Sequence, residues 1–373
     1  MVMSYRGTSA FGLRLPLLKQ GDDLKKIVVE TLKNAKENGE YNPQEDDIIG
    51  LTESIVARTV GKYATIDDVV KSLGDRFRIY DSVYVYNPIF SRNRFSIILR
   101  AIATRFKEVV IISDPVDEVG NDVLHEITLV NYRQFYEEIC KEQGATMRWI
   151  PKKEIMSEIT KIDGDVNIID CTLHPEFDKR KNLNEFVKYI ISSNRLMLSM
   201  CGLVDICDNI SQWGLLGSNK MGEDLLKLYP DKHERELIHS IQNEVKNEFG
   251  LKEVHVMIYG DGCYKDATSG IWEFADPVVS PVYTDGLEGT PAELKLKYLI
   301  DNEFGELDGD ELKESITERI KNKSVKQGTM ETQGTTPRRY TDLLGSLMDL
   351  MSGSGDKGTP VIIVQDYFKN YSM

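Results

Sequence analysis

The chain has 373 residues, of which 41% are hydrophobic and 28% are charged, as is usual for a soluble globular protein with one large or two ordinary domains. Its formal net charge of −14 argues against a general binder of nucleic acids or anionic membranes, because phosphate contacts need clustered lysines and arginines. No apolar run is long enough to span a membrane, the first residues lack a signal-peptide pattern, and the five cysteines are widely spaced. We therefore expect a cytoplasmic protein with reduced thiols and with neither a nucleic-acid nor a membrane partner.

The first segment predicts a capped helix followed by a buried strand and a second helix. Asp22 or Asp23 can cap a helix whose apolar face holds Leu24, Ile27, Val28 and Leu32. The apolar run 46–51 predicts a buried strand that leads into Thr52, and the helix that follows is expected to stop at Gly61.

A candidate anion site lies where this strand ends. Glu53, Ser54 and Arg58 place a carboxylate, a hydroxyl and a cation just beyond the strand, a common arrangement for holding a phosphate or carboxylate group. An exposed helix cap with a solvated arginine is the alternative interpretation.

The middle of the chain alternates strand and helix patterns. Strands are expected at 83–86, 109–112 and 167–170, and helices at 95–106 and 135–141, which together indicate a parallel α/β layer. Ser91–Arg94 lies between a predicted strand and a helix N-terminus, where an anion would be stabilised. Cations at the start of a helix also occur as ordinary surface residues.

A sharp glycine turn follows the central strand 254–259, whose alternating Val254, Val256 and Ile258 predict a half-buried strand. In Gly260-Asp261-Gly262 a carboxylate is presented between two glycines, where a ligand or metal can approach, and Lys265, Asp266 and Glu273 follow in the same loop. Upstream, the Gly214–Asn219 turn offers backbone amides, a hydroxyl and an amide that suit a phosphate or a guanine edge. A polar hairpin loop explains the central turn equally well.

The C-terminal part predicts two helices and a second glycine-rich loop. Pro291 is expected to open a helix, and residues 341–351 a further one with Leu344, Leu347, Met348 and Met351 on its core face. The loop 352–360 leaves backbone amides uncovered, while Asp356 and Lys357 offer opposite charges to a phosphate–metal pair. It lacks the Walker order, and a plain connection into the strand 361–364 would also account for its glycines.

Several of these stretches resemble the coenzyme F420-0:gamma-glutamyl ligase family. They are the run Gly12–Leu24 (GLRLPLLKQGDDL), Thr52–Lys62, Gly214–Asn219, the loop 258–270 and the last glycine-rich loop, 350–360. The likeness covers roughly 1–70 and 212–373, whereas the middle does not match the family core. We therefore predict a mixed α/β fold with a ligase-like core at 1–75 and 201–373 and an inserted α/β subdomain at 76–200, as in a longer bacterial branch of the family.

The resemblance implies a homodimeric ligase that uses GTP and a divalent metal, Mg²⁺ or Mn²⁺. Such a ligase activates an acceptor carboxylate as an acyl phosphate, and the amine of glutamate or a similar amino acid then forms the amide. It assigns nucleotide contacts to Leu15, Pro16, Leu17, Leu18, Glu53, Ser54, Arg58, Asn219, Gly353, Gly355 and Lys357. It assigns the metal to Asp261 and Asp356, and we take Asp261, Lys265 and Arg58 as the candidate catalytic residues.

The chain also departs from the family pattern at places where carboxylates are expected. Leu216 stands where the family has an aspartate in its Gly-Ile-Asp-Ala-Ser-Asn turn, and Ser354 or a neighbour replaces a glutamate in the last glycine-rich loop. Fewer oxygen ligands weaken a site for hard cations. A nucleotide- or metabolite-binding protein without ligase activity is therefore the alternative function.

Overall fold

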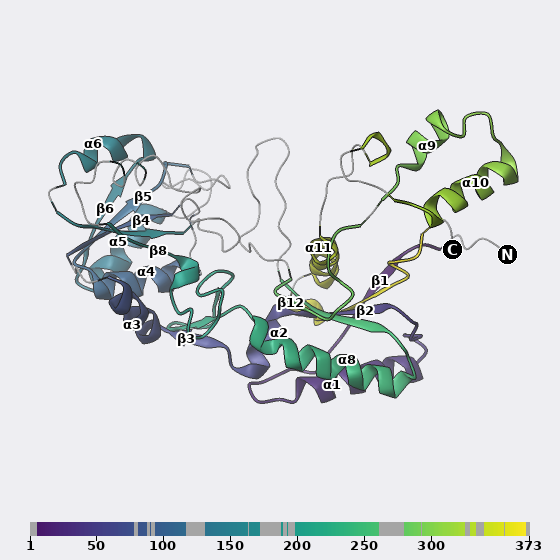
Figure 1. Ribbon diagram of the computed structural model, residues 1–373. Helices are drawn as coiled ribbons and strands as arrows, with labels where there is room; N and C mark the ends of the chain where they lie inside the picture. Colours follow the sequence, from purple (N-terminus) through teal and green to yellow (C-terminus); the bar gives the residue numbers. More distant parts are fainter. Residues whose placement is uncertain are drawn as a thin grey trace.

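The computed structural model describes residues 6–77, 81–87, 90, 94–116, 131–162, 164–171, 188, 192, 198–260, 280–291, 293–324, 329–332, 339–353 and 355–370. In these ranges the chain forms three sheets with helices packed on them, which confirms the predicted α/β class. The sheets fall into two lobes, with the strands β4–β8 in one and β1, β2, β11, β12 and β13 in the other (Figure 1). The predicted domain boundaries stay a prediction.

The lobe that contains β1 and β2, which we call the core lobe, is built on a five-stranded mixed sheet. Its strands lie in the order β1-β13-β2-β11-β12. β2 and β11 are parallel, and their register pairs Thr52 with Tyr259 at the carboxyl end of both strands. β13 runs antiparallel between β1 and β2. The strands are β1 (Ser9–Leu13), β2 (Asp47–Thr52), β11 (Val254–Tyr259), β12 (Val282–Tyr283) and β13 (Val361–Gln365).

Helices cover both faces of this sheet, so β2 and β13 have apolar runs at their centres. The strand β11 was expected to be half-buried, but all six of its residues are buried, His255 included. The helices α1 (Leu24–Glu37) and α8 (Arg235–Phe249) pack on one face with Leu32, Ile49 and Val256 in their core. On the other face α11 (Tyr340–Ser352) buries Leu344 and Met348 against Met257, Tyr259 and Ile362.

The helix boundaries of the core lobe follow the local signals that were predicted. The Asp23 side chain accepts a hydrogen bond from the Lys26 amide at 3.1 Å and so caps α1. The helix α2 (Glu53–Val60) ends at Gly61, whose φ of 74° is left-handed and therefore favours glycine.

Two expectations for the C-terminal part are wrong. No helix begins at Pro291: α9 (Leu296–Asn302) starts five residues later, because Lys295 is extended and its amide donates to the Glu331 carbonyl at 2.8 Å. Met351 is 37% exposed and is not core filler, since the buried positions of α11 are Thr341, Leu344, Gly345 and Met348.

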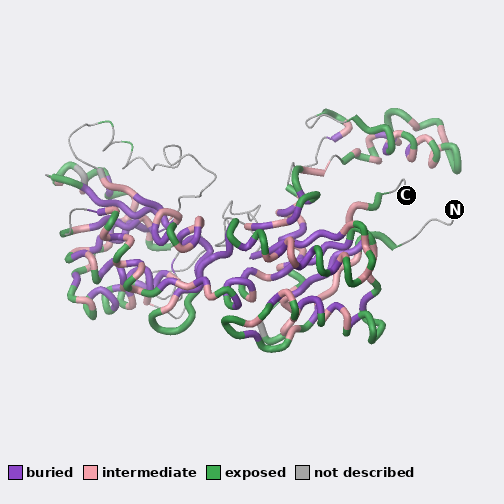
Figure 2. The backbone as a smooth tube through the Cα atoms, turned by 60° about the horizontal axis from the view of Figure 1, so that its bottom comes forward, coloured by how far each residue is buried: buried purple, intermediate pink, exposed green. Residues whose placement is uncertain are grey.

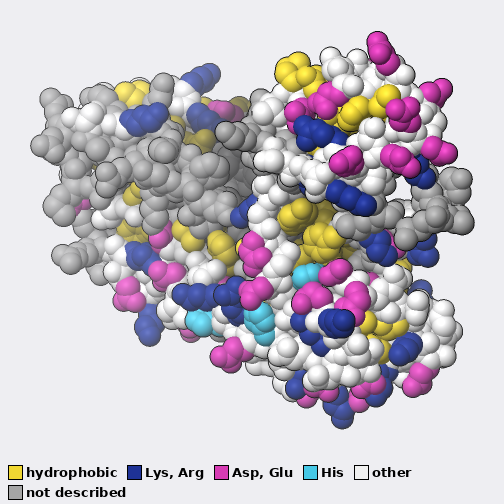
Figure 3. All heavy atoms as spheres, turned by 45° about the vertical axis from the view of Figure 1, so that its right-hand side comes forward, with side chains coloured by type: hydrophobic (Ala, Val, Ile, Leu, Met, Phe, Trp, Pro, Cys, Tyr) yellow, Lys and Arg dark blue, Asp and Glu magenta, His cyan; other side chains and the backbone are white. Residues whose placement is uncertain are grey.

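The segment that contains α9 and α10 (Gly309–Lys321) is an arm rather than a packed layer. Figure 2 shows that it is mostly exposed, whereas the buried backbone is gathered in the two lobes. Only Leu299, Ile316 and Ile320 of these two helices are buried. Acidic side chains are spread over this arm at the top of Figure 3, as expected for a solvated surface.

The second lobe, called here the insert lobe, contains a five-stranded sheet in which every strand is parallel. Its strands are β4 (Ser82–Tyr86), β5 (Glu108–Ile112), β6 (Thr146–Ile150), β7 (Val166–Asp170) and β8 (Leu198–Gly202), in the order β6-β5-β4-β7-β8. The helices α3 (Ile66–Arg76), α4 (Arg94–Arg105) and α5 (Tyr132–Glu142) share one apolar cluster, and α6 (Ile155–Ile159) begins with Ile155, which is buried in another. The expected parallel α/β layer is confirmed.

A small antiparallel sheet lies where the two lobes meet. It has the order β3-β10-β9, with β3 (Tyr63–Thr65), β10 (Leu225–Lys227) and β9 (Asn219–Lys220). β3 directly follows α2 of the core lobe and precedes α3 of the insert lobe. The chain therefore enters the insert lobe through β3 and returns through β10.

Candidate functional site

Three loops converge at one edge of the core sheet. Because β2 and β11 are parallel, both end at the same edge, and β13, which is antiparallel to β2, begins there opposite Leu51. β1 ends at the same level, since Leu13 pairs with Val361. The loop after β1, the start of α2 and the loop between α11 and β13 therefore meet at this edge.

These loops enclose a cavity of about 370 Å³. That volume lies within the range of about 300–1,000 Å³ usual for small-molecule sites. The cavity is lined by Leu15, Pro16, Leu17, Leu18, Thr52, Ser54, Ile55, Arg58, Ser352, Gly353, Gly358, Thr359 and Pro360. The structure thus brings together Leu15–Leu18, Ser54, Arg58 and Gly353, which the sequence analysis assigned to nucleotide binding from three distant stretches.

The walls of the cavity are held by hydrogen bonds between the loops. The Thr52 amide donates to the Pro360 carbonyl at 3.0 Å, and the Leu15 amide donates to the Gly358 carbonyl at 3.4 Å. The Thr359 hydroxyl donates to the Ser352 carbonyl at 3.0 Å. The shape of the cavity therefore exists without a ligand, which lowers the ordering entropy lost on binding.

Tyr259 supports the same wall from below. Its ring is buried at the end of β11, and its hydroxyl donates to the Pro360 carbonyl at 3.3 Å. Burial raises the pKa of this phenol well above its usual value, with Asp349 and Glu53 adding to the effect and a hydrogen bond with Ser352 opposing it. Tyr259 is therefore neutral at physiological pH and acts as a support for the loop.

The polar side of the cavity is the first turn of α2. Thr52 occupies the N-cap position without making a side-chain capping bond, and Ser54 and Ile55 of the first turn line the cavity. Arg58 lies four residues after Ser54 and therefore on the same helical face. Free amides at a helix N-terminus together with a guanidinium favour an anion at this position.

Lys357 does not itself line the cavity, but its ammonium group lies beside Gly353, which does. Gly353 has a φ of 63°, and a Cβ atom at this position would lie only 2.6 Å from the Lys357 Nζ. Any larger residue would therefore displace the ammonium group. The glycine makes room for Lys357 beside the cavity, so the groups present suit a ligand that carries phosphate.

Other predicted contact residues lie elsewhere. Glu53 is 5% exposed, and its Oε1 accepts a hydrogen bond from the Lys227 Nζ at 2.5 Å. Asn219 is an exposed residue of β9 and pairs with Lys227 of β10. Neither residue lines the cavity in the part of the chain that is described. Their nucleotide contacts stay a prediction.

The expected metal ligands are not assembled by the described residues. Asp356 is exposed in the short turn Gly355–Lys357, and Asp261 and Lys265 lie outside the described ranges. Within those ranges, no three His, Cys, Asp or Glu side chains are close enough to hold a metal ion. The metal assignment of Asp261 and Asp356 therefore stays a prediction.

The site also contains residues that the sequence analysis did not assign. Thr52, Ile55, Thr359 and Pro360 complete the lining, and Tyr259 supports it. Ser352 and Gly358, which also line the cavity, belong to the stretch Ser352–Gly358 that the family resemblance assigned to the phosphates. The end of each predicted strand was the available signal, because the carboxyl ends of parallel strands are where α/β proteins bind ligands.

The fold and this edge define an α/β protein with a preformed, anion-favouring cavity at the carboxyl end of a mixed sheet. The sequence model of the family described as F420-0:Gamma-glutamyl ligase matches residues 12–366, nearly the whole chain. The chain belongs to the F420-0:gamma-glutamyl ligase family. The match also spans the insert lobe.

The other comparisons add little to this assignment. No curated protein matches the chain at a significant level. The chain is similar to a solved structure described as eIF2B beta from Chaetomium thermophilum, with 13% sequence identity and a TM-score of 0.18. That alignment covers 28% of this chain and 29% of the other, and so slight a likeness supports no argument. None of the helices in the described ranges is both long and apolar enough to span a bilayer.

Proposed function

We propose that the chain is an amide ligase of the F420-0:gamma-glutamyl ligase type, which joins L-glutamate or a similar amino acid to a carboxylate acceptor. GTP or another nucleoside triphosphate supplies the activating phosphate, with Mg²⁺ or Mn²⁺ as the divalent metal. The observation that carries the proposal is the cavity in which Leu15–Leu18, Ser54, Arg58 and Gly353 meet.

The reaction has two balanced steps. An oxygen of the acceptor carboxylate attacks the terminal phosphorus of the nucleotide, which gives an acyl phosphate and a nucleoside diphosphate. The amine of the amino acid then attacks the acyl carbon, forms the amide and releases inorganic phosphate, while the amine loses a proton. Phosphoryl transfer of this kind depends mainly on positioning and on neutralisation of negative charge.

The residues of the cavity suit the first step. The amides at the start of α2 and the guanidinium of Arg58 would hold phosphate oxygens, and Lys357 lies beside Gly353 on the other wall. The apolar side chains of Leu15, Leu17 and Leu18 would contact the nucleoside. A divalent metal, when bound, would supply further charge neutralisation, and Asp261 stays the proposed ligand from the family resemblance.

The experiment compares nucleotide binding by the wild type and Arg58→Gln, using isothermal titration calorimetry with GTP or ATP and Mg²⁺. Removal of a charge-assisted hydrogen bond worth about 1.5–3 kcal/mol lowers the affinity by roughly 10- to 100-fold. Arg133→Gln is the matched control, because Arg133 is an exposed residue of α5 that pairs only one helical turn away with Glu137 at 3.0 Å. If the wild type and Arg58→Gln bind the nucleotide with equal affinity, the cavity is not the nucleotide site.

Turnover is tested separately, by phosphate release with glutamate and F420-0 as acceptor and by trapping the acyl phosphate with hydroxylamine. We expect release only when nucleotide, acceptor and amino acid are all present.

We also propose that the chain acts as a homodimer in the cytoplasm, where its described cysteines would remain the free thiols that the structure shows. Light scattering of the purified chain checks the dimer.

A second candidate function is nucleotide binding without ligation. It is favoured by Leu216, which replaces the family's aspartate and is 6% exposed in the apolar cluster of the insert lobe, with Trp213 packed against that cluster. At this position the chain stabilises packing instead of presenting a carboxylate. Saturable nucleotide binding without phosphate release under every acceptor and amino-acid combination would support this alternative.

A further inference from the structure

The insert lobe has the strand order of a doubly wound sheet. Numbered along the chain, its five parallel strands lie in the order third, second, first, fourth, fifth. The connections from β4 to β5 and from β5 to β6 contain α4 and α5, which contribute to one apolar cluster. The connection from β6 to β7 contains α6, whose Ile155 packs in the cluster on the other face.

The strand order therefore reverses between β4 and β7. In open α/β sheets, ligands bind outside the carboxyl ends of the strands at this point of reversal, because the connections leave the two central strands toward opposite faces and open a crevice. This edge belongs to a different sheet from the one that carries the cavity of the core lobe.

Two buried polar side chains follow directly on the strands at this edge. Asn87 comes after the last residue of β4, and Ser113 comes after the last residue of β5; their backbones are adjacent, since the Asn87 amide donates to the Ile112 carbonyl at 3.2 Å. Asn87 is 4% exposed and Ser113 is 1% exposed.

Both side chains point to the same face of the sheet. Val83 and Val85 of β4, and Val109 and Ile111 of β5, belong to the cluster under α4 and α5. Since side chains alternate along a strand, Asn87 and Ser113 continue those two rows on the same face.

Neither polar group is satisfied within the part of the chain that the structure describes. The Asn87 Nδ2 and the Ser113 Oγ are buried without a hydrogen-bond partner. Buried polar groups in native proteins are almost always hydrogen-bonded. Two neighbouring exceptions at the carboxyl edge of this sheet therefore indicate that a bound ligand supplies the missing hydrogen bonds.

A cationic side chain, that of Arg94, lies at the same edge of the sheet. Arg94 is the first residue of α4, a helix of 12 residues that directs its N-terminus to this edge. Removal from water raises the pKa of the Cys171 thiol, which follows β7, and Asp170 adds to this effect, whereas the Arg94 guanidinium opposes it. Arg94 therefore lies close enough to act on the end of β7, the strand on the other side of the reversal.

The chemistry of these groups favours a ligand with a single phosphate group over a dinucleotide with its pyrophosphate. The stretch 87–94 reads NPIFSRNR, so its sequence lacks the glycines of the dinucleotide-binding fingerprint. An amide NH₂, a hydroxyl and a guanidinium are donors that suit the oxygens of a phosphate group. Asp170 continues the row of Ile168, which belongs to the opposite face of the sheet, and so its carboxylate is turned away from these donors.

We propose that the insert lobe has a second ligand site at the carboxyl edge between β4 and β7, where Asn87, Ser113 and Arg94 bind the phosphate group of a small phosphate monoester. This site is independent of the cavity in the core lobe and of the ligase reaction. It gives the inserted sheet a binding role of its own.

The test measures binding of AMP by isothermal titration calorimetry and of inorganic phosphate by phosphorus NMR, using the full chain. The variants are Arg94→Gln and Ser113→Ala, compared with Arg58→Gln in the core-lobe cavity and Arg133→Gln on the surface of α5. We expect Arg94→Gln to weaken AMP binding by roughly tenfold, as loss of one charge-assisted hydrogen bond implies. Ser113→Ala should weaken it in the same direction, and the other two variants should retain this binding event.

Several results would overturn the site. One is the absence of saturable binding of both probes, and another is AMP binding that Arg58→Gln abolishes and Arg94→Gln leaves unchanged. Ser113→Ala is expected to fold, because it only removes an unsatisfied hydroxyl. If it raises the melting temperature and leaves AMP affinity unchanged, the hydroxyl is a tolerated packing defect and not a ligand contact.

Discussion

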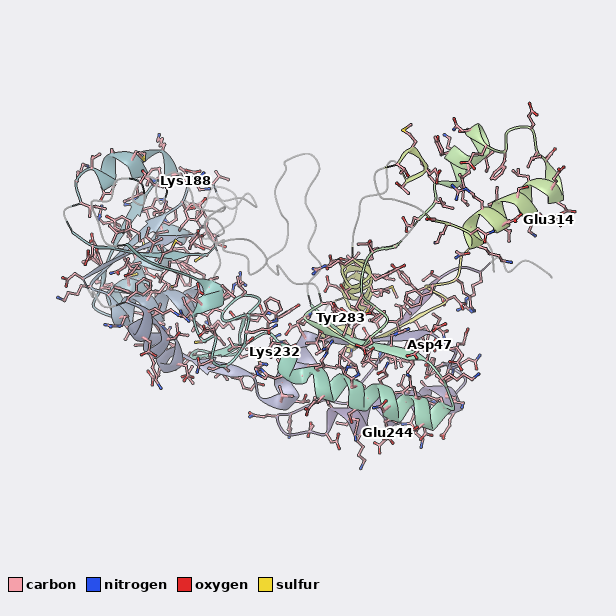
Figure 4. The ribbon with its side chains drawn as sticks, viewed as in Figure 1. Asp47, Lys188, Lys232, Glu244, Tyr283 and Glu314 are labelled. Atoms are coloured by element: carbon pink, nitrogen blue, oxygen red, sulfur yellow. The ribbon has the colours of Figure 1, made fainter. Side chains whose placement is uncertain are left out.

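A buried cluster of charges joins the core lobe to the returning chain, and its central cation offers a decisive test. The Lys62 Nζ contacts Glu234 Oε1 and Oε2 at 2.9 and 2.8 Å and Asp231 Oδ1 at 3.0 Å. The three side chains are 6%, 8% and 0% exposed. Lys232, between the two acidic residues in sequence, is labelled in Figure 4 near the start of α8, between the two lobes.

The variant Lys62→Met keeps the length of the side chain and removes its charge. Asp231 and Glu234 would then be two buried carboxylates without the lysine, and the His233 Nδ1, 2.7 Å from the Asp231 Oδ1, would be the remaining basic group beside them. Breaking a buried ion pair by removing one partner typically lowers the free energy of unfolding by about 3–5 kcal/mol. For a domain of this size that corresponds to a fall in melting temperature of roughly 6–20 °C.

The pH dependence supplies a second readout. Burial raises the pKa of Asp231, but hydrogen bonds from the His233 and Gln212 amides and from Lys62 outweigh it, and the net shift is downward. A carboxyl group with a lowered folded-state pKa adds stability above its unfolded pKa of about 4, and this stability is lost as the pH falls through the folded pKa. Without Lys62 the Asp231 pKa rises, so the loss should begin at a higher pH.

The assay is urea denaturation of the wild type and the variant at several pH values, followed by circular dichroism. Lys107→Met is the control, because the Lys107–Asp81 pair at 2.9 Å is 82% and 76% exposed and should change stability by less than about 1 kcal/mol. Adding Glu234→Gln to Lys62→Met should restore part of the loss, since it removes one of the stranded charges. A Lys62→Met protein as stable as the control, or no recovery in the double variant, would refute the reasoning.

Three further predictions concern the interior of the two lobes. A Cβ at Gly50 would lie 2.1 Å from the Sδ of Met348, which is fully buried, so Gly50→Ala should lower the free energy of unfolding by about 1–3 kcal/mol in urea titrations. Gly74→Ala should instead raise it by about 0.5–1 kcal/mol, because Gly74 lies inside α3 and the added Cβ would be in ordinary van der Waals contact with Arg105 at 3.5 Å; a destabilised variant would contradict this. Removal from water raises the pKa of Asp47, so its ionisation costs stability as the pH rises from about 4 through the folded pKa. Asp47→Asn removes that cost, and the stability of the variant relative to the wild type should increase over this interval; a constant difference in denaturation curves would argue against it.

Much of the fold follows from local patterns. The apolar runs at 48–51 and 361–364 and the alternation of strands and helices in the insert lobe predict the observed elements, because strands buried on both faces are apolar along their length. The alternation at 254–259 predicts a half-buried strand, which is wrong, since all six of its residues are buried. The helix expected at Pro291 shows the limit of such reasoning. A hydrogen bond between Lys295 and the distant Glu331 carbonyl overrides the local preference, and nothing near Pro291 encodes that partner.

The candidate site, like the fold, could be predicted from the sequence only in part. The strand-end residues Ser54 and Arg58 and the glycine-rich loop were recognisable by type, and the structure places them around one cavity. The pairing of Glu53 with Lys227, 174 positions away, could not be foreseen, because it depends on how β10 returns beside β3. Long-range ion pairs are decided by topology, which one sequence pattern does not specify.

The antiparallel pairing of β3 and β10 has a consequence for how this chain is built. Thr65, where the chain departs toward the insert lobe, lies directly opposite Leu225, where it comes back. The two ends of a stretch of more than 150 residues are thus separated by no more than the width of a hairpin. A short turn could close the same gap, because the outgoing and returning segments are neighbouring strands of one small sheet.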